Sequence, residues 1–271
     1  MLISALQLFC QNLSLFAKLF LDNKSVFFDV TGFKYYLLVH TRPGPPLRHH
    51  ICGFFSKEKL SWDNNNLACI LVFPPWQRKG LGSLLMGVSY EISRREGILG
   101  GPEKPISDLG RKGYRRFWAG EVVRWLLGLD LSKKVVYVPP PPILDPDGDI
   151  EMDSKDKPQS QQPPATADPK DADFIIDVAE CSRATWITPE DCLTVLREMG
   201  VAEDAGVGLG KVEIGPEGEM KPPKVAHRVR IRRDDVRSWI KQQGISLERT
   251  CDPEGFVRGY AIPKGQEPKG D

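Results

Sequence analysis

The sequence predicts an α+β protein in which a group of strands precedes a group of helices, with a smaller α/β module near the end. Aromatic and β-branched runs recur between residues 25 and 73, and helical periodicity follows at 81–97 and 107–129. A proline-rich stretch then separates these segments from a second ordered region. A chain of 271 residues with 41% hydrophobic content can bury one substantial core or two modest ones.

The first 24 residues are largely apolar, but we expect neither a secretory signal nor a membrane span there. There is no basic region at the start, and four polar side chains interrupt the apolar ones: Gln7, Gln11, Asn12 and Lys18. We expect an amphipathic helix whose core-facing residues recur at spacings of three and four: Leu6, Phe9, Leu13, Phe16 and Phe20.

Four strands are predicted next, at 25–30, 33–40, 50–59 and 66–73, with a hairpin turn at Thr31–Gly32. A helix from residue 81 should end before Gly97. A second helix should start after Ser107, whose hydroxyl suits an N-cap.

Composition divides the chain further. We expect a core at 1–138, a linker at 139–172, a winged-helix-like module at 173–262 and a flexible tail at 263–271. The linker holds nine prolines and is acidic, so it cannot bury enough apolar surface to offset its ordering entropy. The core has 19 basic and 10 acidic side chains, which favours an anionic ligand.

The expected module places a helix at 187–200, a short strand at 228–233 and a small helix at 234–244, the order of a winged helix. Its first helix starts at Thr188–Pro189 and ends at Gly200. Residues 173–271, the module together with the tail, have 15 basic and 18 acidic side chains, and Glu190 and Glu198 lie on the helix that would read DNA. A protein-packing role is therefore favoured over DNA reading.

Six cysteines are scattered without a C-x-x-C pair, which predicts reduced thiols in an intracellular protein. His49, His50 and Cys52 lie close together, but no second ligand pair follows, so we expect a polar loop there and no metal site.

The segment "QRKGLG", residues 77–82, lies where a buried strand leads into a helix. Free N–H groups and the helix dipole make such a position an anion site, and two glycines permit close approach of a pyrophosphate. A Walker A loop would need Lys and Ser or Thr directly after Gly82, and a dinucleotide fingerprint would need glycine at Leu85. Neither pattern fits, which leaves the short glycine-loop form associated with acetyl-coenzyme A.

The stretch "LACILVFPPWQRKGLGSLLMGVSYEISRREGILGGPEKPISDLG" resembles the core of the MYST family of histone acetyltransferases. The upstream segments "LFCQNLSLFAKLFLDNKSVFFDV" and "GFFSKEKLSWDNNNLACI" extend the resemblance, which is close over residues 8–127 and loose in the C-terminal module. The fungal silencing-associated SAS-type branch is the most similar. The resemblance implies a GNAT-like core that transfers acetyl from acetyl-CoA to lysine, mostly on histone tails.

Residue roles follow from the same resemblance. It implies a general base at Glu103, a candidate acyl acceptor at Cys69 and a self-acetylated lysine at Lys24. The pantetheine and thioester end would contact the backbone of Ile70, Leu71 and Val72, and Ser107 would also contact the cofactor. The pyrophosphate would be held by Arg78, Lys79, Gly80, Leu81, Gly82 and Ser83.

A lysine side chain titrates near ~10.4, so a base must remove its proton before it attacks a thioester at neutral pH. A carboxylate in a partly apolar site can do so once its pKa is raised, and Glu103 lies on a loop stiffened by Pro102 and Pro105. We expect direct attack by lysine, with Cys69 lining the site; the acetyl-cysteine route stays open, because a buried cysteine is also ordinary core.

Family members carry a C-x-x-C…H-x-x-x-C zinc module just before the "LFCQNL" helix, and the sequence from Met1 leaves no room for one. Either the branch lacks it or the sequence is a piece of a longer chain. The implied partners are a histone tail, that of histone H4 if the branch holds, together with complex subunits and nonspecific nucleosomal DNA, in the nucleus and without a membrane. Two alternatives stay open: a non-catalytic chromatin scaffold and a small-molecule N-acetyltransferase.

Overall fold

The computed structural model describes residues 4–21, 28–129, 174–209, 213–214, 220–221 and 225–262. The expected linker at 139–172, the expected tail at 263–271 and Lys24 lie outside these residues. The chain divides into two compact units, and the predicted α+β class is confirmed as a mixture of helices and antiparallel sheets. The first unit comprises Met1–Glu121, Trp186–Thr188 and Ser246–Asp271, and the second comprises Val122–Thr185 and Pro189–Ile245.

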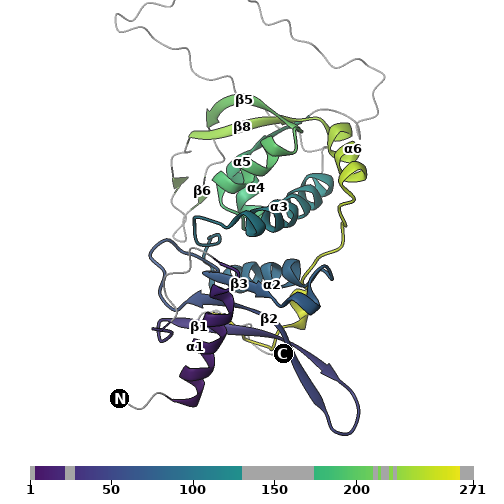
Figure 1. Cartoon of the computed structure of the whole chain (residues 1–271). Helices are drawn as coiled ribbons and strands as arrows, with labels where there is room; N and C mark the ends of the chain where they lie inside the picture. Colours follow the sequence, from purple (N-terminus) through teal and green to yellow (C-terminus); the bar gives the residue numbers. More distant parts are fainter. Residues whose placement is uncertain are drawn as a thin grey trace, which may run out of the picture. The chain divides into compact units, whose positions relative to one another are not determined.

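The first unit contains a three-stranded antiparallel sheet in the order β1-β2-β3 (Figure 1). Its strands are β1 (Phe33–Arg42), β2 (Arg48–Glu58) and β3 (Cys69–Val72). The hairpin predicted at residues 31–32 is wrong, because the turn that joins paired strands lies at 43–47, where three prolines and a glycine cannot continue a ladder. Of the predicted strand at 25–30, the described residues 28–30 lie in no strand.

The residues 49–52 belong to β2, so the expectation of a polar loop there is also wrong. The pattern of two adjacent histidines did not reveal the ladder, because His49 and His50 pair with Thr41 and His40 of β1 through the backbone. A strand can carry polar side chains wherever both of its faces are exposed to solvent.

The two faces of this sheet are covered by different helices, α1 (Ala5–Lys18) and α2 (Leu81–Glu96) (Figure 1). Neighbouring side chains of a strand point to opposite faces. Phe54 accordingly packs with the α1 cluster and Phe55 with the α2 cluster, and both rings are fully buried. The α1 cluster contains Leu13, Ala17, Phe54, Cys69 and Leu71, and the α2 cluster contains Phe55, Leu67, Leu85 and Ile92.

The helix α1 forms as predicted, with the Ser4 hydroxyl accepting from the N–H of Gln7 at its start. Its predicted core face is wrong apart from Leu13, because the buried residues are Leu13, Ser14 and Ala17. Small side chains let the helix approach the sheet closely, and the Ser14 hydroxyl lies 2.7 Å from that of Tyr35. The other four residues of the predicted core face are exposed: Leu6, Phe9, Phe16 and Phe20.

The helix α3 (Asp108–Gly128) begins where the sequence predicts. The N–H of Gly110 donates to the Ser107 hydroxyl at 3.2 Å, so Ser107 caps the helix. Its first half packs against α2: the Trp118 indole N–H donates to the Tyr90 hydroxyl at 2.7 Å. α2 is thereby fixed on two sides, by the sheet and by α3.

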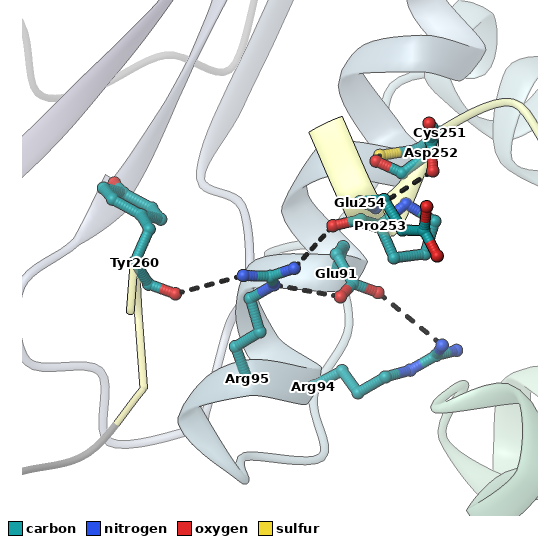
Figure 2. Close-up of polar contacts among 8 residues, drawn as sticks. All are labelled: Glu91, Arg94, Arg95, Cys251, Asp252, Pro253, Glu254 and Tyr260. Carbon is teal, nitrogen blue, oxygen red and sulfur yellow. Dashed lines mark hydrogen bonds and ion pairs between the residues drawn. The ribbon is translucent and has the colours of Figure 1, made fainter. Parts of the chain in front are cut away.

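The C-terminal residues 246–262, which we call the strap, lie against α2 although more than 150 positions separate them in sequence (Figure 2). The Arg95 guanidinium donates to the carbonyl of Pro253 at 2.6 Å and pairs with the Glu91 carboxylate at 3.0 Å. It also lies 4.3 Å from the centre of the Phe256 ring. The strap contains a short turn of helix, η2 (Pro253–Gly255), capped by the Asp252 carboxylate.

The strap approaches α2 most closely at Gly87. A Cβ atom at this position would lie 2.8 Å from the Cβ of Cys251 and 3.0 Å from the hydroxyl of Thr250. Glycine is therefore needed for the observed packing, because any side chain would push the strap away from the helix.

The second unit has a three-stranded antiparallel sheet in the order β4-β8-β5, with β4 (Phe174–Asp177), β5 (Ala202–Leu209) and β8 (Val225–Ile231). Two helices, α4 (Val178–Thr185) and α5 (Pro189–Glu198), lie between β4 and β5 in sequence. The predicted start and end of α5 are confirmed, since the helix begins at Pro189 and is followed by Gly200 with a φ of 68°. The remaining elements are α6 (Arg233–Gln243) and the short pair β6 (Glu213–Ile214) and β7 (Met220–Lys221).

Candidate functional site

The strand β3 lies at the edge of its sheet. It pairs with β2 from Gly53 to Ser56, and the described sheet has no further strand beyond it. Gly53 allows the two strands to meet, because a Cβ there would lie 2.5 Å from the carbonyl oxygen of Leu71. An edge strand can form backbone hydrogen bonds with an extended ligand. The expected pantetheine contacts, Ile70, Leu71 and Val72, all lie on this strand.

The chain leaves β3 through a tightly folded turn. The 3₁₀ turn η1 (Pro74–Trp76) follows Phe73, and the Gln77 amide reaches back to donate to the carbonyl of Val72 at 2.9 Å. Arg78 then takes a φ of 60° and Gly80 a φ of 77°. A left-handed conformation at a non-glycine residue costs roughly 1 kcal/mol or more, so the turn holds Arg78 in an unfavourable backbone conformation to present the next residues.

The helix α2 begins directly after this turn, and no side chain caps its first N–H groups. Gly80 occupies the N-cap, so no side chain accepts from these groups, and the first turn carries no acidic residue. The first N–H groups of a helix have no intrahelical partner, and the helix dipole adds partial positive charge there. Neither Gly80 nor Gly82 has any atom within 4 Å of the position that a Cβ would occupy.

Two cations flank these N–H groups. Arg78 and Lys79 are exposed, and the ammonium of Lys79 lies 5.1 Å from the centre of the Trp76 ring. Leu81, Gly82 and Ser83 complete the first helical turn. The arrangement can bind a pyrophosphate with backbone N–H groups and fixed charge.

Glu103 lies on the loop between α2 and α3, and this loop is joined to the start of β3. Its backbone N–H donates to the carbonyl of Leu67 at 2.8 Å, two residues before Cys69. Leu67 and Pro102 also form a parallel bridge. The Glu103 side chain is exposed, rather than set in a partly apolar site.

The loop is held by Asn66, a residue that the motifs of the sequence did not single out. Its side chain is fully buried and donates to the carbonyl of Gly100, while its backbone N–H donates to that of Gly101 at 2.9 Å. A Cβ at Gly100 would lie 1.8 Å from the carbonyl oxygen of Asn64, so the two segments cross in contact. Only its place beside the strand could have indicated this role, because asparagine is common in turns.

Cys69 is buried, with 5% of its surface exposed, in the cluster on the α1 face of the sheet. Tyr35 packs against the same cluster, and burial raises the pKa of its hydroxyl while the hydrogen bond with Ser14 partly opposes the rise. Cys69 and Glu103 are thus brought to the same end of β3. Ser107 lies four residues beyond Glu103, where it caps α3.

Comparisons with known proteins place the site in a family context. The sequence pattern of the family described as MOZ/SAS matches residues 4–138. A segment of 113 residues is 58% identical to histone acetyltransferase MOF of Drosophila melanogaster, covering 41% of this chain and 13% of that protein. Histone acetyltransferase SAS2 of Saccharomyces cerevisiae is 48% identical over 124 residues, 46% of this chain and 35% of the relative. Histone acetyltransferase ESA1 of Gibberella zeae is 50% identical over 130 residues, 48% and 25% of the two chains.

The match therefore spans between about an eighth and about a third of the length of these relatives. Within the described ranges, no helix is both long enough and apolar enough to cross a membrane. The same residues contain no group of three His, Cys, Asp or Glu side chains that could hold a metal ion.

Proposed function

Residues 4–138 of this chain belong to the MOZ/SAS family, of the MYST histone acetyltransferases, and from that premise we propose that the chain is a histone lysine acetyltransferase. It transfers acetyl from acetyl-CoA to the ε-amine of a lysine, with the histone H4 tail as the preferred substrate. The observation that carries the proposal is the uncapped, glycine-lined start of α2, which directly follows the edge strand β3 within the matched segment.

The cofactor's pyrophosphate rests on the first turn of α2, from Gly80 to Ser83, with Arg78 and Lys79 supplying charge. Ser107 contacts the cofactor from the start of α3. The pantetheine arm runs along the free edge of β3 at Ile70, Leu71 and Val72, which brings the thioester toward Cys69 and the Glu103 loop.

In the chemical step the lysine amine attacks the thioester carbonyl, and a C–N bond forms as the C–S bond breaks. Glu103 takes the proton that the amine loses, and coenzyme A leaves as a thiolate that is then protonated. The Glu103 carboxylate is exposed in the free protein. The bound cofactor and histone tail would cover it and exclude water, which gives it the partly apolar surroundings that a general base needs.

Direct attack is favoured over an acetyl-cysteine intermediate. The Cys69 side chain is packed among Leu13, Ala17, Phe54 and Leu71, so it lines the site from within the core. A nucleophilic cysteine generally needs an exposed, electropositive surrounding that lowers its pKa. The burial of Cys69 supports a packing role.

Labelled acetyl-CoA tests the proposal when it is incubated with the protein and either histones or small amines. Label on histones supports it, label on small amines supports a metabolite acetyltransferase, and label on neither supports a non-catalytic scaffold. We expect Glu103→Gln to lower kcat at least about 100-fold with coenzyme A affinity unchanged, since general-base catalysis contributes on that scale. We expect Cys69→Ala to keep substantial activity, and the reverse pattern would exchange the two roles.

We extend the proposal to three further features of the protein. Lys24 is acetylated by the protein itself, which intact-mass measurement would show as a mass gain absent from Lys24→Arg and from Glu103→Gln. The protein works in the nucleus with complex subunits, as chromatin enzymes do. The residues 173–262 contain a winged-helix-like module, which the order β4-β8-β5 with α4 and α5 between its first two strands supports.

A further inference from the structure

The hairpin of β1 and β2 continues past the third strand as a free two-stranded ribbon. β3 pairs only with Gly53–Ser56, so the pairs from Val39↔Ile51 to Arg42↔Arg48 have no third strand in the described sheet. Residues 39–50 are all exposed. Figure 1 shows this hairpin reaching out from the sheet beyond β3.

The ribbon, which we define as residues 39–51, has one strongly basic face. Arg42 lies opposite Arg48 and His40 lies opposite His50 in the ladder. Residues directly opposite each other in a ladder share a face of the sheet, and so do residues two apart along one strand, such as His40 and Arg42. All four side chains therefore lie on the same face. No Asp or Glu occurs anywhere between residues 30 and 57.

The basic face is continued by the turn that precedes α2. The Trp76 ring lies 5.2 Å from the ring of His40 and 6.4 Å from that of His50, measured between centroids. The ammonium of Lys79 lies 5.1 Å from the centre of the same Trp76 ring. A line of cationic and aromatic side chains therefore runs from the candidate pyrophosphate turn to the tip of the ribbon.

The tip itself contains a recess of about 340 Å³ between the two opposed arginines. Like charges opposite each other destabilise a ladder, and among the described residues neither Arg42 nor Arg48 forms an ion pair. An anion in the recess would relieve this repulsion. The recess is lined by Arg42, Pro43, Gly44, Pro45, Pro46 and Arg48.

We infer that this ribbon is a binding site for the phosphate backbone of duplex DNA. The inference rests on the proposed function to the extent that a nucleosomal substrate brings DNA beside the histone tail. The major groove of DNA is about 12 Å wide and admits a two-stranded β-ribbon. The four free residue pairs span roughly 10 Å, and the turn at 43–47 continues the ribbon beyond them, so its tip can reach phosphates at the groove edge.

The chemistry of the ribbon favours DNA over an acidic protein. Protein interfaces depend on buried apolar and aromatic anchors. In the ribbon, Val39 and Ile51 lie on the face opposite the basic one, and Leu47 is the one large apolar side chain of the turn. Binding to phosphates requires little apolar area, because it is driven by charge neutralisation and release of counter-ions. The ribbon supplies fixed charge on a rigid edge and carries no base-reading pattern, so binding should be independent of sequence.

The test measures binding of the full chain to a duplex of about 20 base pairs by fluorescence anisotropy, from about 50 to 200 mM salt. In the variant Arg42→Gln/Arg48→Gln we expect affinity near 100 mM salt to fall about tenfold. The slope of log affinity against log salt should fall by about two, since each lost phosphate contact removes about one. Two unrelated duplex sequences should give the same result.

The matched control is Lys34→Gln/Lys59→Gln, which removes the same charge from exposed positions at the opposite end of these strands. This control should keep most of the wild-type affinity for DNA and an unchanged salt slope. Equal losses in both double variants would mean that net charge alone drives binding, and an unchanged ribbon variant or a wild type that ignores DNA would equally overturn the inference.

Nucleosomes and a free H4-tail peptide separate the remaining outcomes. The ribbon variant should acetylate the peptide at the wild-type rate and nucleosomes several-fold more slowly. Weaker binding to nucleosomes with unchanged binding to bare DNA would assign the ribbon to an acidic protein surface and contradict the inference. Wild-type DNA binding without any acetyl transfer would contradict the proposed function and leave the ribbon site standing.

Discussion

The two ends of α2 are built in opposite ways. Its first turn has no side-chain cap, no acidic residue and two glycines beside open space. Its last turn is closed by Gly97 in a left-handed conformation, and Arg95 joins it to Glu91 and to the strap (Figure 2). One end therefore leaves its hydrogen-bonding groups for a ligand, whereas the other satisfies them within the protein.

This difference shows how the helix can combine binding with stability. A glycine at the N-cap forgoes roughly a few tenths of a kcal/mol that a Ser, Thr or Asp cap would contribute. The strap offsets that loss with contacts made at the far end of the same helix, where no ligand is expected. Changes at the two ends should consequently separate, with stability affected at one end and cofactor binding at the other.

The largest effect on stability should come from Arg95→Ala. The guanidinium is 18% exposed, pairs with Glu91, donates to the carbonyls of Pro253 and Tyr260, and stacks on Phe256. Losing charged hydrogen bonds of this kind should cost about 2–3 kcal/mol, and it should release the strap. Thermal denaturation measures the first effect and limited proteolysis within 246–262 the second.

Arg94→Ala is the control for this prediction. Arg94 is the neighbouring residue on α2, with 37% of its side chain exposed and an ion pair with Glu91 at 3.6 Å. It should lower stability by less than about 1 kcal/mol and leave the strap protected. The comparison between the ends of α2 fails if the two arginine variants lose equal stability.

A smaller loss should follow from Gly87→Ala, beneath the strap. The added methyl group would meet Cys251 at 2.8 Å, so the strap must move, which should cost about 1–3 kcal/mol. Gly82→Ala is the matched substitution at the other end of the helix, where the methyl group meets nothing within 4 Å. It should leave the melting temperature unchanged or raise it slightly, because alanine favours the helix.

The smallest effect concerns the thiol of Cys251 in the strap. Burial raises its pKa first, and the carboxylates of Glu91 and Asp252 raise it further. The thiolate fraction near pH 8 is then below that of an ordinary cysteine, so iodoacetamide should label Cys251 several-fold more slowly than an unfolded reference peptide. Site-resolved mass spectrometry would show the rate, and Arg95→Ala should raise it. Labelling at the reference rate in the intact protein would mean that the strap is not seated on α2.

Much of the helical framework could be predicted from local signals. The end of α2 at Gly97, the start of α3 at Ser107 and the start of α5 at Pro189 follow from caps that act within one turn. The glycine turn at 77–82 was predicted for the same reason, because backbone conformation and helix start are encoded in adjacent residues.

The contacts between distant segments could not be predicted. Neither periodicity nor charge indicates that 246–262 packs on α2, because contacts such as those of Arg95 and Gly87 leave no repeating pattern in the sequence. The buried face of α1 was mistaken since Ser14 and Ala17 are small rather than apolar and large, and close approach to the sheet selected them. The hairpin was misplaced because Thr31–Gly32 and 43–47 both carry turn residues, and only pairing across the sheet decides between them.

Binding of coenzyme A at the start of α2 can be tested by calorimetric titration of coenzyme A into the wild type and into Gly82→Val, with Gly87→Ala as the control. We expect heat of binding in the wild type, at least a tenfold weaker affinity in Gly82→Val with an unchanged melting temperature, and wild-type affinity in folded Gly87→Ala. Equal affinity of the wild type and Gly82→Val, or a folded wild type that binds no coenzyme A, would contradict binding at this position.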